Sequence, residues 1–345
     1  MMNSGVHMAL AALLALFTGA CASTSQVALA PVWPSAPAIP RIQFIASLTG
    51  PGDVDKGILR RILRTAKGEH LPALAKPHGL AVDGDTLYVV DSHLAIVHVF
   101  DRGAGRYRYF PKRPTIDGFT HPIGVAVASS GRVFVSDAES GRVHVFEAGG
   151  RQYLGSLGEG LLKRPTGLTL TPDSRLLVVD TVASTLLAFD PATLDHLSTT
   201  GRSGKGEDGF HYPTDVAVGP DGTIYVADTL NFRIQVIDPE GAFIDSFGAA
   251  GDAPGYFSRP KAVAVDSDGN IYAVDALFDN VQIFSHDGDL LFGFGGPGNG
   301  PGQFWLPNAI TIDRANRIYI SDPHNGRVQI FQYLTNGAVP EGGLP

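Results

Sequence analysis

Six copies of one short sequence unit dominate the chain. Each copy opens with a Pro, continues through two apolar runs separated by a turn, and closes the second run with an Asp. The opening prolines are Pro77, Pro122, Pro165, Pro213, Pro260 and Pro307, and the closing aspartates are Asp91, Asp137, Asp180, Asp228, Asp275 and Asp322. By subtraction, successive aspartates lie 43 to 48 residues apart. One such unit buries too little surface to be stable alone, so the copies must pack on one another.

The unit itself predicts four strands. In the best preserved copy, residues 212–248, short apolar runs alternate with turns such as Pro220-Asp221-Gly222, in which Pro pre-sets its own φ and Gly tolerates positive φ. The 42 Gly and 24 Pro among 345 residues also favour many turns and short strands. A four-stranded repeat of this length is typical of a β-propeller blade. We therefore predict an all-β, six-bladed propeller of four-stranded antiparallel blades.

The last unit lacks its fourth strand, because only Gly- and Pro-rich sequence follows Phe331. The segment Ile42–Leu48 precedes the first unit and is similar to the fourth strand of the best preserved copy, Phe243–Phe247. We expect it to pair with the third strand of the last unit, Val328–Phe331. That pairing closes the ring and removes open sheet edges.

The repeat resembles the NHL family over about residues 41–333. The residues that carry the resemblance are the P-x-[GD]-V-A-V start, the I-Y-V-A-D second strand and the N-x-R-I-Q-V third strand. The chain looks specifically like the six-bladed NHL propellers of bacterial envelope lipoproteins. The family's Arg falls on Arg142, Arg233 and Arg327, five residues after the Asp. The first and third units lack this Arg, and we expect looser loops there. One Asp per blade at a fixed position is better explained by hydrogen bonds to its own turn than by a metal.

The N-terminal segment has the features of a targeting signal. Residues 1–20 contain a 13-residue apolar run, Met8–Ala20, which suits a signal peptide and is too short to span a bilayer. Small residues before the sole cysteine, Cys21, resemble the bacterial lipobox, which implies lipidation and, with Ala22 next, the outer membrane. An ordinary secretory signal with an incidental Cys is the alternative. Residues 21–40 carry four prolines and no charge, and we expect an unfolded tether of roughly 60 Å. Residues 334–345 form a tail.

The residue after each opening Pro is expected to line the mouth of the central channel. These six are His78, Ile123, Thr166, Thr214, Lys261 and Asn308. In the next ring, Asp215 stands where the other blades place Gly or Ala, and we expect it to form a channel salt bridge with Lys261 rather than a catalytic pair. His324 lies in a loop of the same face, the top face, where loops on a rigid scaffold carry function.

Pro77-His78-Gly79 resembles a motif of the peptide-amidating lyases, which hold zinc with several histidines. Only one blade carries the His here, whereas zinc needs three or four ligands. The single Cys excludes a disulfide framework, and no catalytic motif is present. We expect no metal and no cofactor.

One segment before the first repeat is strongly basic and has the pattern of an amphipathic helix. Residues 56–67, KGILRRILRTAK, place apolar side chains at helical spacing. This segment carries a charge of +5, and because the net charge of the chain is −8, the remaining residues carry −13. We expect this helix to pack on the propeller, with contact to anionic lipid or an acidic partner as the alternative. An acidic chain argues against nucleic acid. The sequence thus predicts a monomeric, non-catalytic, lipid-anchored envelope propeller whose top face binds a protein, peptide or glycan. The alternative is a channel-mouth lyase or hydrolase of the peptide-amidating-lyase or streptogramin-lyase kind, with or without a metal.

Overall fold

The computed structural model describes residues 30–55, 57, 71–112 and 118–335. The chain divides into two units, Met1–Ala30 and Pro31–Pro345, and the second holds all the secondary structure described below. The predicted signal peptide, Cys21, the helix over 56–67 (apart from Gly57) and the tail after residue 335 lie outside the described residues. Within the described ranges, no helix has the length and apolar character needed to cross a membrane.

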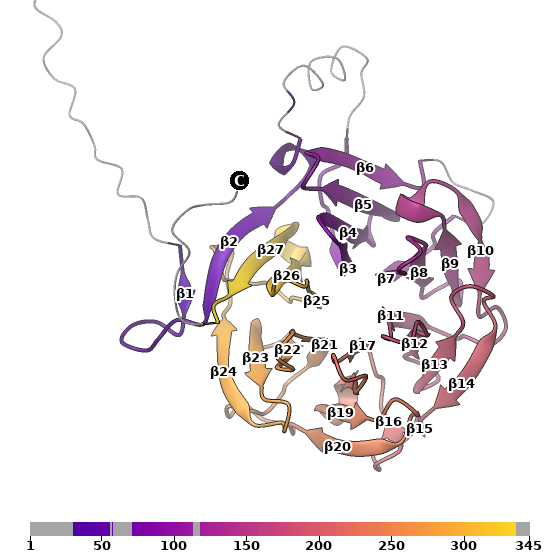
Figure 1. The fold of residues 1–345 in the computed structure, drawn as a ribbon. Helices are drawn as coiled ribbons and strands as arrows, with labels where there is room; N and C mark the ends of the chain where they lie inside the picture. Colours follow the sequence, from indigo (N-terminus) through magenta and orange to yellow (C-terminus); the bar gives the residue numbers. More distant parts are fainter. Residues whose placement is uncertain (1–29, 56, 58–70, 113–117, 336–345) are drawn as a thin grey trace, which may run out of the picture. The chain divides into compact units, whose positions relative to one another are not determined.

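Six antiparallel sheets form a ring, and each is one blade (Figure 1). Blade 1 contains β3 (Pro77–Asp83), β4 (Thr86–Asp91), β5 (Ile96–Asp101) and β6 (Arg106–Phe110). Blade 2 contains β7 (Pro122–Val127), β8 (Val133–Asp137), β9 (Arg142–Phe146) and β10 (Tyr153–Leu157). Blade 3 contains β11 (Pro165–Leu170), β12 (Leu176–Asp180), β13 (Thr185–Phe189) and β14 (His196–Thr200). In every blade the first strand is innermost; the fourth is outermost in blades 1 to 5, whereas in blade 6 a fifth strand, β1, lies outside it.

The second half of the ring repeats this order. Blade 4 contains β17 (Asp215–Val218), β18 (Ile224–Asp228), β19 (Arg233–Ile237) and β20 (Phe243–Phe247). Blade 5 contains β21 (Pro260–Val265), β22 (Ile271–Asp275), β23 (Asn280–Phe284) and β24 (Leu290–Gly295). Blade 6 contains β25 (Ala309–Ile312), β26 (Arg317–Asp322), β27 (Arg327–Tyr333), β2 (Ile42–Leu48) and β1 (Val32–Trp33). Between blades 3 and 4, β15 (Arg202–Ser203) pairs with β16 (Gly209–Phe210). Single 3-10 turns are η1 (Pro51–Asp53), η2 (Ala148–Gly150), η3 (Thr229–Asn231) and η4 (Pro323–Asn325).

The ring closes as the sequence predicts. Strand β2 pairs antiparallel with β27, with Phe44 opposite Phe331 and Leu48 opposite Val328. Phe44 also meets Phe331 edge-on, with ring centroids 5.7 Å apart. Because the N-terminal strand completes the last blade, the first and last parts of the propeller are held together by a full ladder of backbone hydrogen bonds.

The tether prediction is wrong for its second half. Val32–Trp33 forms β1, which pairs with β2. The Trp33 ring lies 5.9 Å from the rings of both Phe294 and Phe331 and covers Gly302, where a Cβ would lie 2.2 Å from the indole. A two-residue strand carries no periodicity, so the Pro-rich composition hid it. Val32 and Trp33 are therefore part of blade 6.

The hydrophobic core is divided among the contacts between blades. Each of six buried clusters draws on two neighbouring blades, and one example joins Val274 and Phe294 of blade 5 to Ile320 and Phe331 of blade 6. Both faces of every blade are thus covered, which explains the nearly continuous apolar runs in the second and third strands. This packing fixes the angles at which the six inner strands meet.

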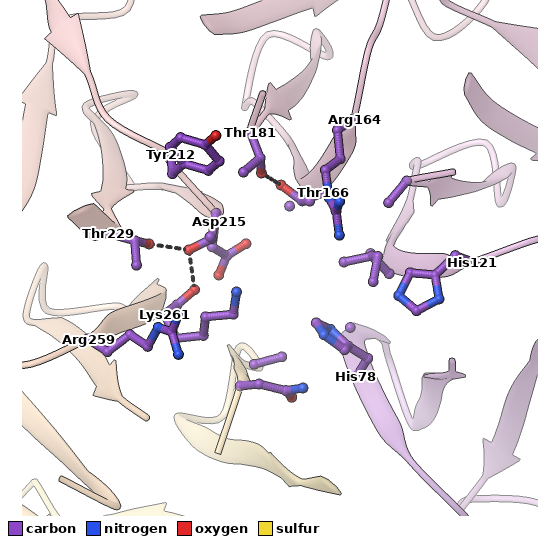
Figure 2. Close-up of a pocket in the computed structure, with 18 of the residues that line it drawn as sticks. His78, His121, Arg164, Thr166, Thr181, Tyr212, Asp215, Thr229, Arg259 and Lys261 are labelled. Atoms are coloured by element: carbon purple, nitrogen blue, oxygen red, sulfur yellow. Dashed lines mark hydrogen bonds between the residues drawn. The ribbon is translucent and has the colours of Figure 1, made fainter. Parts of the chain in front are cut away.

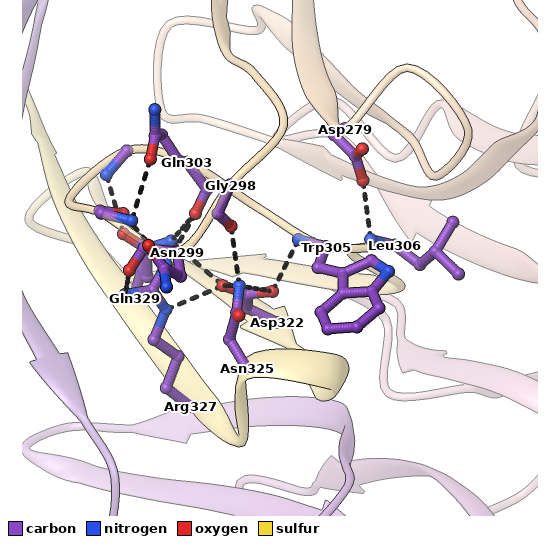
Figure 3. A network of polar contacts seen from close by, with 12 residues as sticks. Asp279, Gly298, Asn299, Gln303, Trp305, Leu306, Asp322, Asn325, Arg327 and Gln329 are labelled. Atoms are coloured by element: carbon purple, nitrogen blue, oxygen red, sulfur yellow. Dashed lines mark hydrogen bonds and ion pairs between the residues drawn. The ribbon is translucent and has the colours of Figure 1, made fainter.

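The closing aspartates fasten the top loops. In blade 6 the Asp322 carboxylate accepts hydrogen bonds from the Trp305 N–H at 2.9 Å and from Arg327 Nε at 2.8 Å (Figure 3). Arg327 then donates to the carbonyls of Asn299 and Gln303, each at 2.7 Å. Blade 4 repeats this arrangement with Asp228 and Arg233, whose Nη2 reaches the Gly206 and Gly209 carbonyls.

The other blades hold these loops differently. Arg142 of blade 2 donates to Glu159 at 3.3 Å. In blades 1, 2, 3 and 5 the Asp accepts several backbone N–H groups, including those of the two residues before the opening Pro. Asp91, for example, accepts four backbone N–H groups, from Ala75, Lys76, His93 and Leu94, and Asp137 and Asp275 each accept four from the equivalent residues. Blades 1 and 3, for which we expected looser loops, therefore fasten them with backbone donors instead of an Arg.

Candidate functional site

A funnel of about 430 Å³ opens at the top face, where the six inner strands begin (Figure 2). The residue after each opening Pro lines it in all six blades: His78, Ile123, Thr166, Thr214, Lys261 and Asn308. Propeller symmetry explains this result, because the same position in each repeat lies at the same distance from the axis. Asp215 borders both this funnel and a second cavity of about 250 Å³ further down the channel, so it marks the narrow floor between them.

Close packing of the inner strands narrows this floor. A Cβ on Gly79 would lie 2.4 Å from the Ile123 carbonyl oxygen, and one on Gly124 would lie 2.4 Å from the Thr166 carbonyl oxygen. The Cβ of a residue replacing Gly167 would lie 2.3 Å from Asp215 Oδ1. Glycine is therefore required at these positions by close backbone approach. As a result, the carboxyl of Asp215 is held directly against the backbone of blade 3.

Hydroxyl pairs join blades 3, 4 and 5 around the funnel. Thr166 and Thr181 share a 2.8 Å hydrogen bond, and Thr181 donates to the Pro213 carbonyl at 2.7 Å. One blade further on, Thr214 and Thr229 repeat the arrangement, with Thr229 donating to the Pro260 carbonyl and Thr214 contacting the Lys261 carbonyl, both at 2.8 Å. These hydroxyls act as positioning groups, because Thr181, Thr214 and Thr229 donate to carbonyls of the next blade and Thr166 donates to Thr181.

The funnel is strongly basic, which the sequence analysis did not anticipate. Besides Lys261, its lining includes Arg164, Arg259 and His121, each directly before an opening Pro. Figure 2 shows Arg164 and Lys261 reaching toward the opening from different blades. Reading the position before the Pro across all six repeats finds the signal: Lys76, His121, Arg164, Tyr212, Arg259 and Leu306. The basic residues among them are Lys76, His121, Arg164 and Arg259. Those that line the funnel are His121, Arg164, Tyr212 and Arg259.

Burial and mutual repulsion perturb the ionisable groups of the wall. Burial lowers the pKa of His78 from 6.5 to about 3, with the charges of Lys261, His121 and Lys76 acting in the same direction. The His78 imidazole is therefore neutral at physiological pH. Burial also lowers the pKa of Lys261 from 10.5 to about 8, helped by Arg259 and Arg164 and opposed by Asp215.

The single carboxyl of the wall is perturbed as well. Burial raises the pKa of Asp215 from 3.8 to about 7, although the N–H groups of Val263 and Val216 and the charge of Lys261 favour its ionised form. Strongly shifted groups that gather at one cavity are a feature of functional sites, because a fold selected for stability alone has no reason to keep them.

The expected salt bridge between Asp215 and Lys261 is not formed among the described residues. Asp215 Oδ2 instead accepts the Val263 N–H of the neighbouring blade at 3.1 Å. Adjacent blades bring the two side chains within electrostatic range, but backbone hydrogen bonding fixes the direction of the carboxylate. His324 lies in η4, a loop of the top face as expected from the sequence; it is outside the funnel lining and stacks on Trp305 with centroids 5.1 Å apart.

The described residues contain no group of three or more His, Cys, Asp or Glu side chains that are close enough to hold a metal ion. His78 and His121 both line the funnel, but they are surrounded by cations, which disfavour a further positive charge. What the wall offers chemically is a positive potential, a neutral imidazole, one carboxyl that titrates near neutral pH, and the amide of Asn308.

Fold and site together define a six-bladed β-propeller with a basic funnel at one end of its channel. A family model described as NHL repeat matches residues 119–146 and 210–237, and one described as 6-bladed beta-propeller matches residues 266–338. The chain is therefore a six-bladed β-propeller that contains NHL repeats.

Solved structures agree on this fold. Virginiamycin B lyase from Staphylococcus aureus is 15% identical with a TM-score of 0.56, and the match covers 76% of this chain and 86% of that one. A gluconolactonase from Xanthomonas campestris is 19% identical with a TM-score of 0.57, covering 75% and 86%. An auxiliary nutrient binding protein from Bacteroides thetaiotaomicron is 13% identical with a TM-score of 0.59, covering 75% and 69%. At these identities the likeness shows the fold alone.

The ionisation of Asp215 leads to a prediction about stability. Because its pKa is raised in the folded state, the folded protein favours the neutral acid, and stability falls as pH rises from about 3.8 to about 7. We expect Asp215→Asn to be more stable than the wild type above pH 7 by about 1–3 kcal/mol, allowing for partial solvation. Urea unfolding at pH 4 and pH 8 measures the difference. An advantage of equal size at both pH values contradicts the assignment.

Proposed function

We propose that this chain is a non-catalytic binding protein whose funnel holds an anionic group of its ligand. The observation that carries the proposal is the convergence of Arg164, Arg259 and Lys261, with two imidazoles, on a cavity whose lining has only one carboxyl. Burial is the main cause of the lowered pKa of His78 and Lys261, and an anion in the funnel relieves the repulsion by neighbouring cations that adds to it. Arg guanidinium groups suit such a ligand because their planar fork binds carboxylate or phosphate with two hydrogen bonds.

The predicted partner, an envelope protein, peptide or glycan, fits this proposal when it carries an acidic group that can enter the funnel. A cavity of about 430 Å³ accepts a small group and not a folded domain. A larger partner therefore binds by inserting one acidic residue or sugar, while its remaining surface rests on the top loops.

A second candidate is a lyase or hydrolase that acts at the same channel mouth. One observation favours it: Asp215 and Lys261, with pKa values of about 7 and 8, titrate in the range in which general acid–base groups are most effective. The names of two similar structures, a virginiamycin B lyase and a gluconolactonase, are compatible with this alternative.

One experiment tests both candidates. The full chain is mixed at low salt with phosphate, sulfate, glucuronate or N-acetylglutamate, and with neutral glucose, and thermal unfolding is followed. A binding anion at about 100 times its Kd raises the midpoint by several degrees, and 0.5 M salt reduces the effect. The ligand is then recovered and weighed by mass spectrometry. Unchanged mass supports binding, chemical change supports the enzyme, and the absence of any anion effect contradicts the proposed function.

We also propose that Cys21 anchors the protein by lipid to the outer membrane of a bacterial envelope. The support is the apolar run with small residues before a sole cysteine. We expect Cys21→Ala to move the protein from the membrane fraction to the soluble fraction and to remove metabolic labelling with a fatty acid. A variant that stays in the membrane fraction and keeps its label contradicts the anchor.

A further inference from the structure

We propose that the group held in the funnel is an acidic sugar, a hydroxylated ring that carries one carboxylate, as in a uronic acid. This inference rests on the proposed function, because it names the ligand class of the same cavity. It follows from three features of the wall: the balance of charge, the hydrogen-bonding groups left unused, and one exposed aromatic ring.

The charge of the wall favours an anionic group. Arg164, Arg259 and Lys261 are opposed by Asp215, which hydrogen-bonds to the backbone at the floor of the same cavity. A carboxylate brings one charge and matches the planar fork of Arg. Neither Arg164 nor Arg259 has a side-chain hydrogen bond or ion pair within the described part of the chain, so both guanidinium groups remain available to a ligand.

The polar groups left unused favour hydroxyls on the ligand. Asp215 Oδ2 accepts one backbone N–H, and a carboxylate has acceptor sites for more. Asn308 accepts a hydrogen bond from Ser321 Oγ at 2.6 Å through its Oδ1, which leaves the two amide hydrogens as donors. An acceptor from blade 4 and a donor from blade 6 thus face one cavity. A hydroxyl is the group that serves both, since it donates and accepts.

The aromatic ring is that of Tyr212, which lines the funnel and has 47% of its surface exposed. Its backbone is in the left-handed region, with φ of 53°, which is uncommon for a residue other than Gly and is frequent at functional sites. The His211 ring meets it edge-on at 5.6 Å. Figure 2 shows Tyr212 on the same side of the funnel as Asp215. An amphipathic ring in this place offers a flat apolar surface for the C–H face of a sugar and a hydroxyl for its rim.

An acidic peptide is the competing ligand. An Asp or Glu side chain supplies the carboxylate but no ring for Tyr212 and no hydroxyl for Asp215 and Asn308. The two classes therefore share their dependence on the Arg side chains and differ in their dependence on Tyr212. This difference gives the test.

The experiment measures the affinities of the full chain for glucuronate and galacturonate, with glucose as the neutral ring and N-acetylglutamate as the acid without a ring. The α-carboxyl of the N-acetylglutamate is blocked as its amide, so that this ligand carries one negative charge like a uronate. Calorimetry gives the affinities, and the His78 imidazole resonances report occupancy of the funnel. We expect at least one uronate to bind about tenfold more tightly than N-acetylglutamate, and glucose not to bind. Tyr212→Asn, which tolerates the left-handed backbone, lowers uronate affinity about tenfold and leaves N-acetylglutamate unchanged. Tyr212→Phe keeps most of the uronate affinity, because the flat face of the ring is retained and only the hydroxyl contact is lost.

The outcomes separate the two proposals. The sugar assignment is overturned, while anion binding stands, if N-acetylglutamate binds as tightly as both uronates. It is also overturned if Tyr212→Asn changes the affinity for the uronates and for N-acetylglutamate by the same factor. If no anion binds, or Arg259→Glu leaves every affinity unchanged, the proposed function itself fails. Uronate binding that is sensitive to both Tyr212 and Arg259 supports both.

Discussion

Arg259→Glu is expected to lower the affinity of the funnel for an anionic ligand by about 30- to 700-fold. The substitution changes the local charge by two units at the wall of a cavity that Arg259 lines. At an effective dielectric of about 20, one charge at about 5 Å contributes roughly 3 kcal/mol, and exposure of the guanidinium reduces this to about 1–2 kcal/mol for each unit. Titration calorimetry at low ionic strength, with the anion that stabilises the wild type, measures the loss.

Arg106→Glu is the matched control. Arg106 begins the outer strand β6 and pairs with Asp101 at 2.7 Å, away from the funnel lining. It changes the net charge of the chain by the same two units, so it reports the effect of overall charge alone. We expect it to alter affinity less than about threefold. Equal losses in the two variants would show that anions are attracted by the whole molecule and not by the funnel.

Removal of residues 1–49 is expected to abolish cooperative folding of the propeller, whereas removal of residues 1–29 leaves the unfolding midpoint of the propeller unchanged. The longer deletion takes away β1 and β2, and with them Ile42, which is fully buried, and Phe44, which packs on Phe331. Each large buried side chain contributes about 2–5 kcal/mol, and β27 also loses its backbone partner. The sum is comparable to the whole stability of a protein of this kind, about 5–15 kcal/mol. Circular dichroism during heating measures both variants.

A peptide of residues 30–49 provides the complementary test. Added in trans to the chain that lacks residues 1–49, it should pair with β27 and restore a cooperative transition, because the edge of that strand is otherwise open. The same peptide with Ile42→Lys should not, since a charge would replace a fully buried apolar side chain. A cooperative transition in the deleted chain without any peptide would contradict a structural role for this closure.

Repetition explains why so much of this propeller is predictable. Six copies place equivalent residues at equivalent radii, so the strands, the closing pairing of Ile42–Leu48 and the ring of residues after each Pro all follow from alignment of the chain with itself. The same comparison, applied one residue earlier, would have found Arg164 and Arg259. We missed them because that position looked like a loop before a strand, where the direction of a side chain is not evident from sequence.

The features that were not predicted from the sequence are those that differ between the blades. The strand β1 has two residues, and its pairing depends on the exposed edge of β2 and on the aromatic cluster that receives Trp33. Asp215 and Lys261 were expected to pair because they lie on adjacent blades. Whether two side chains of adjacent blades meet depends on the twist of the blades and on competing backbone donors. Here the Asp215 carboxylate accepts the Val263 N–H and does not pair with Lys261.

The sequence by itself therefore determined the architecture, because hydrophobic runs, turn residues and a fixed repeat length are local properties that add up around a ring. It also determined one ring of residues at the mouth of the channel, those that follow each opening Pro. Only the tertiary structure decided what those residues are chemically. The convergence of six blades brings cations from distant parts of the chain into one funnel and removes water from His78, Asp215 and Lys261. The resulting pKa shifts are properties of that shared environment and of no single stretch of sequence.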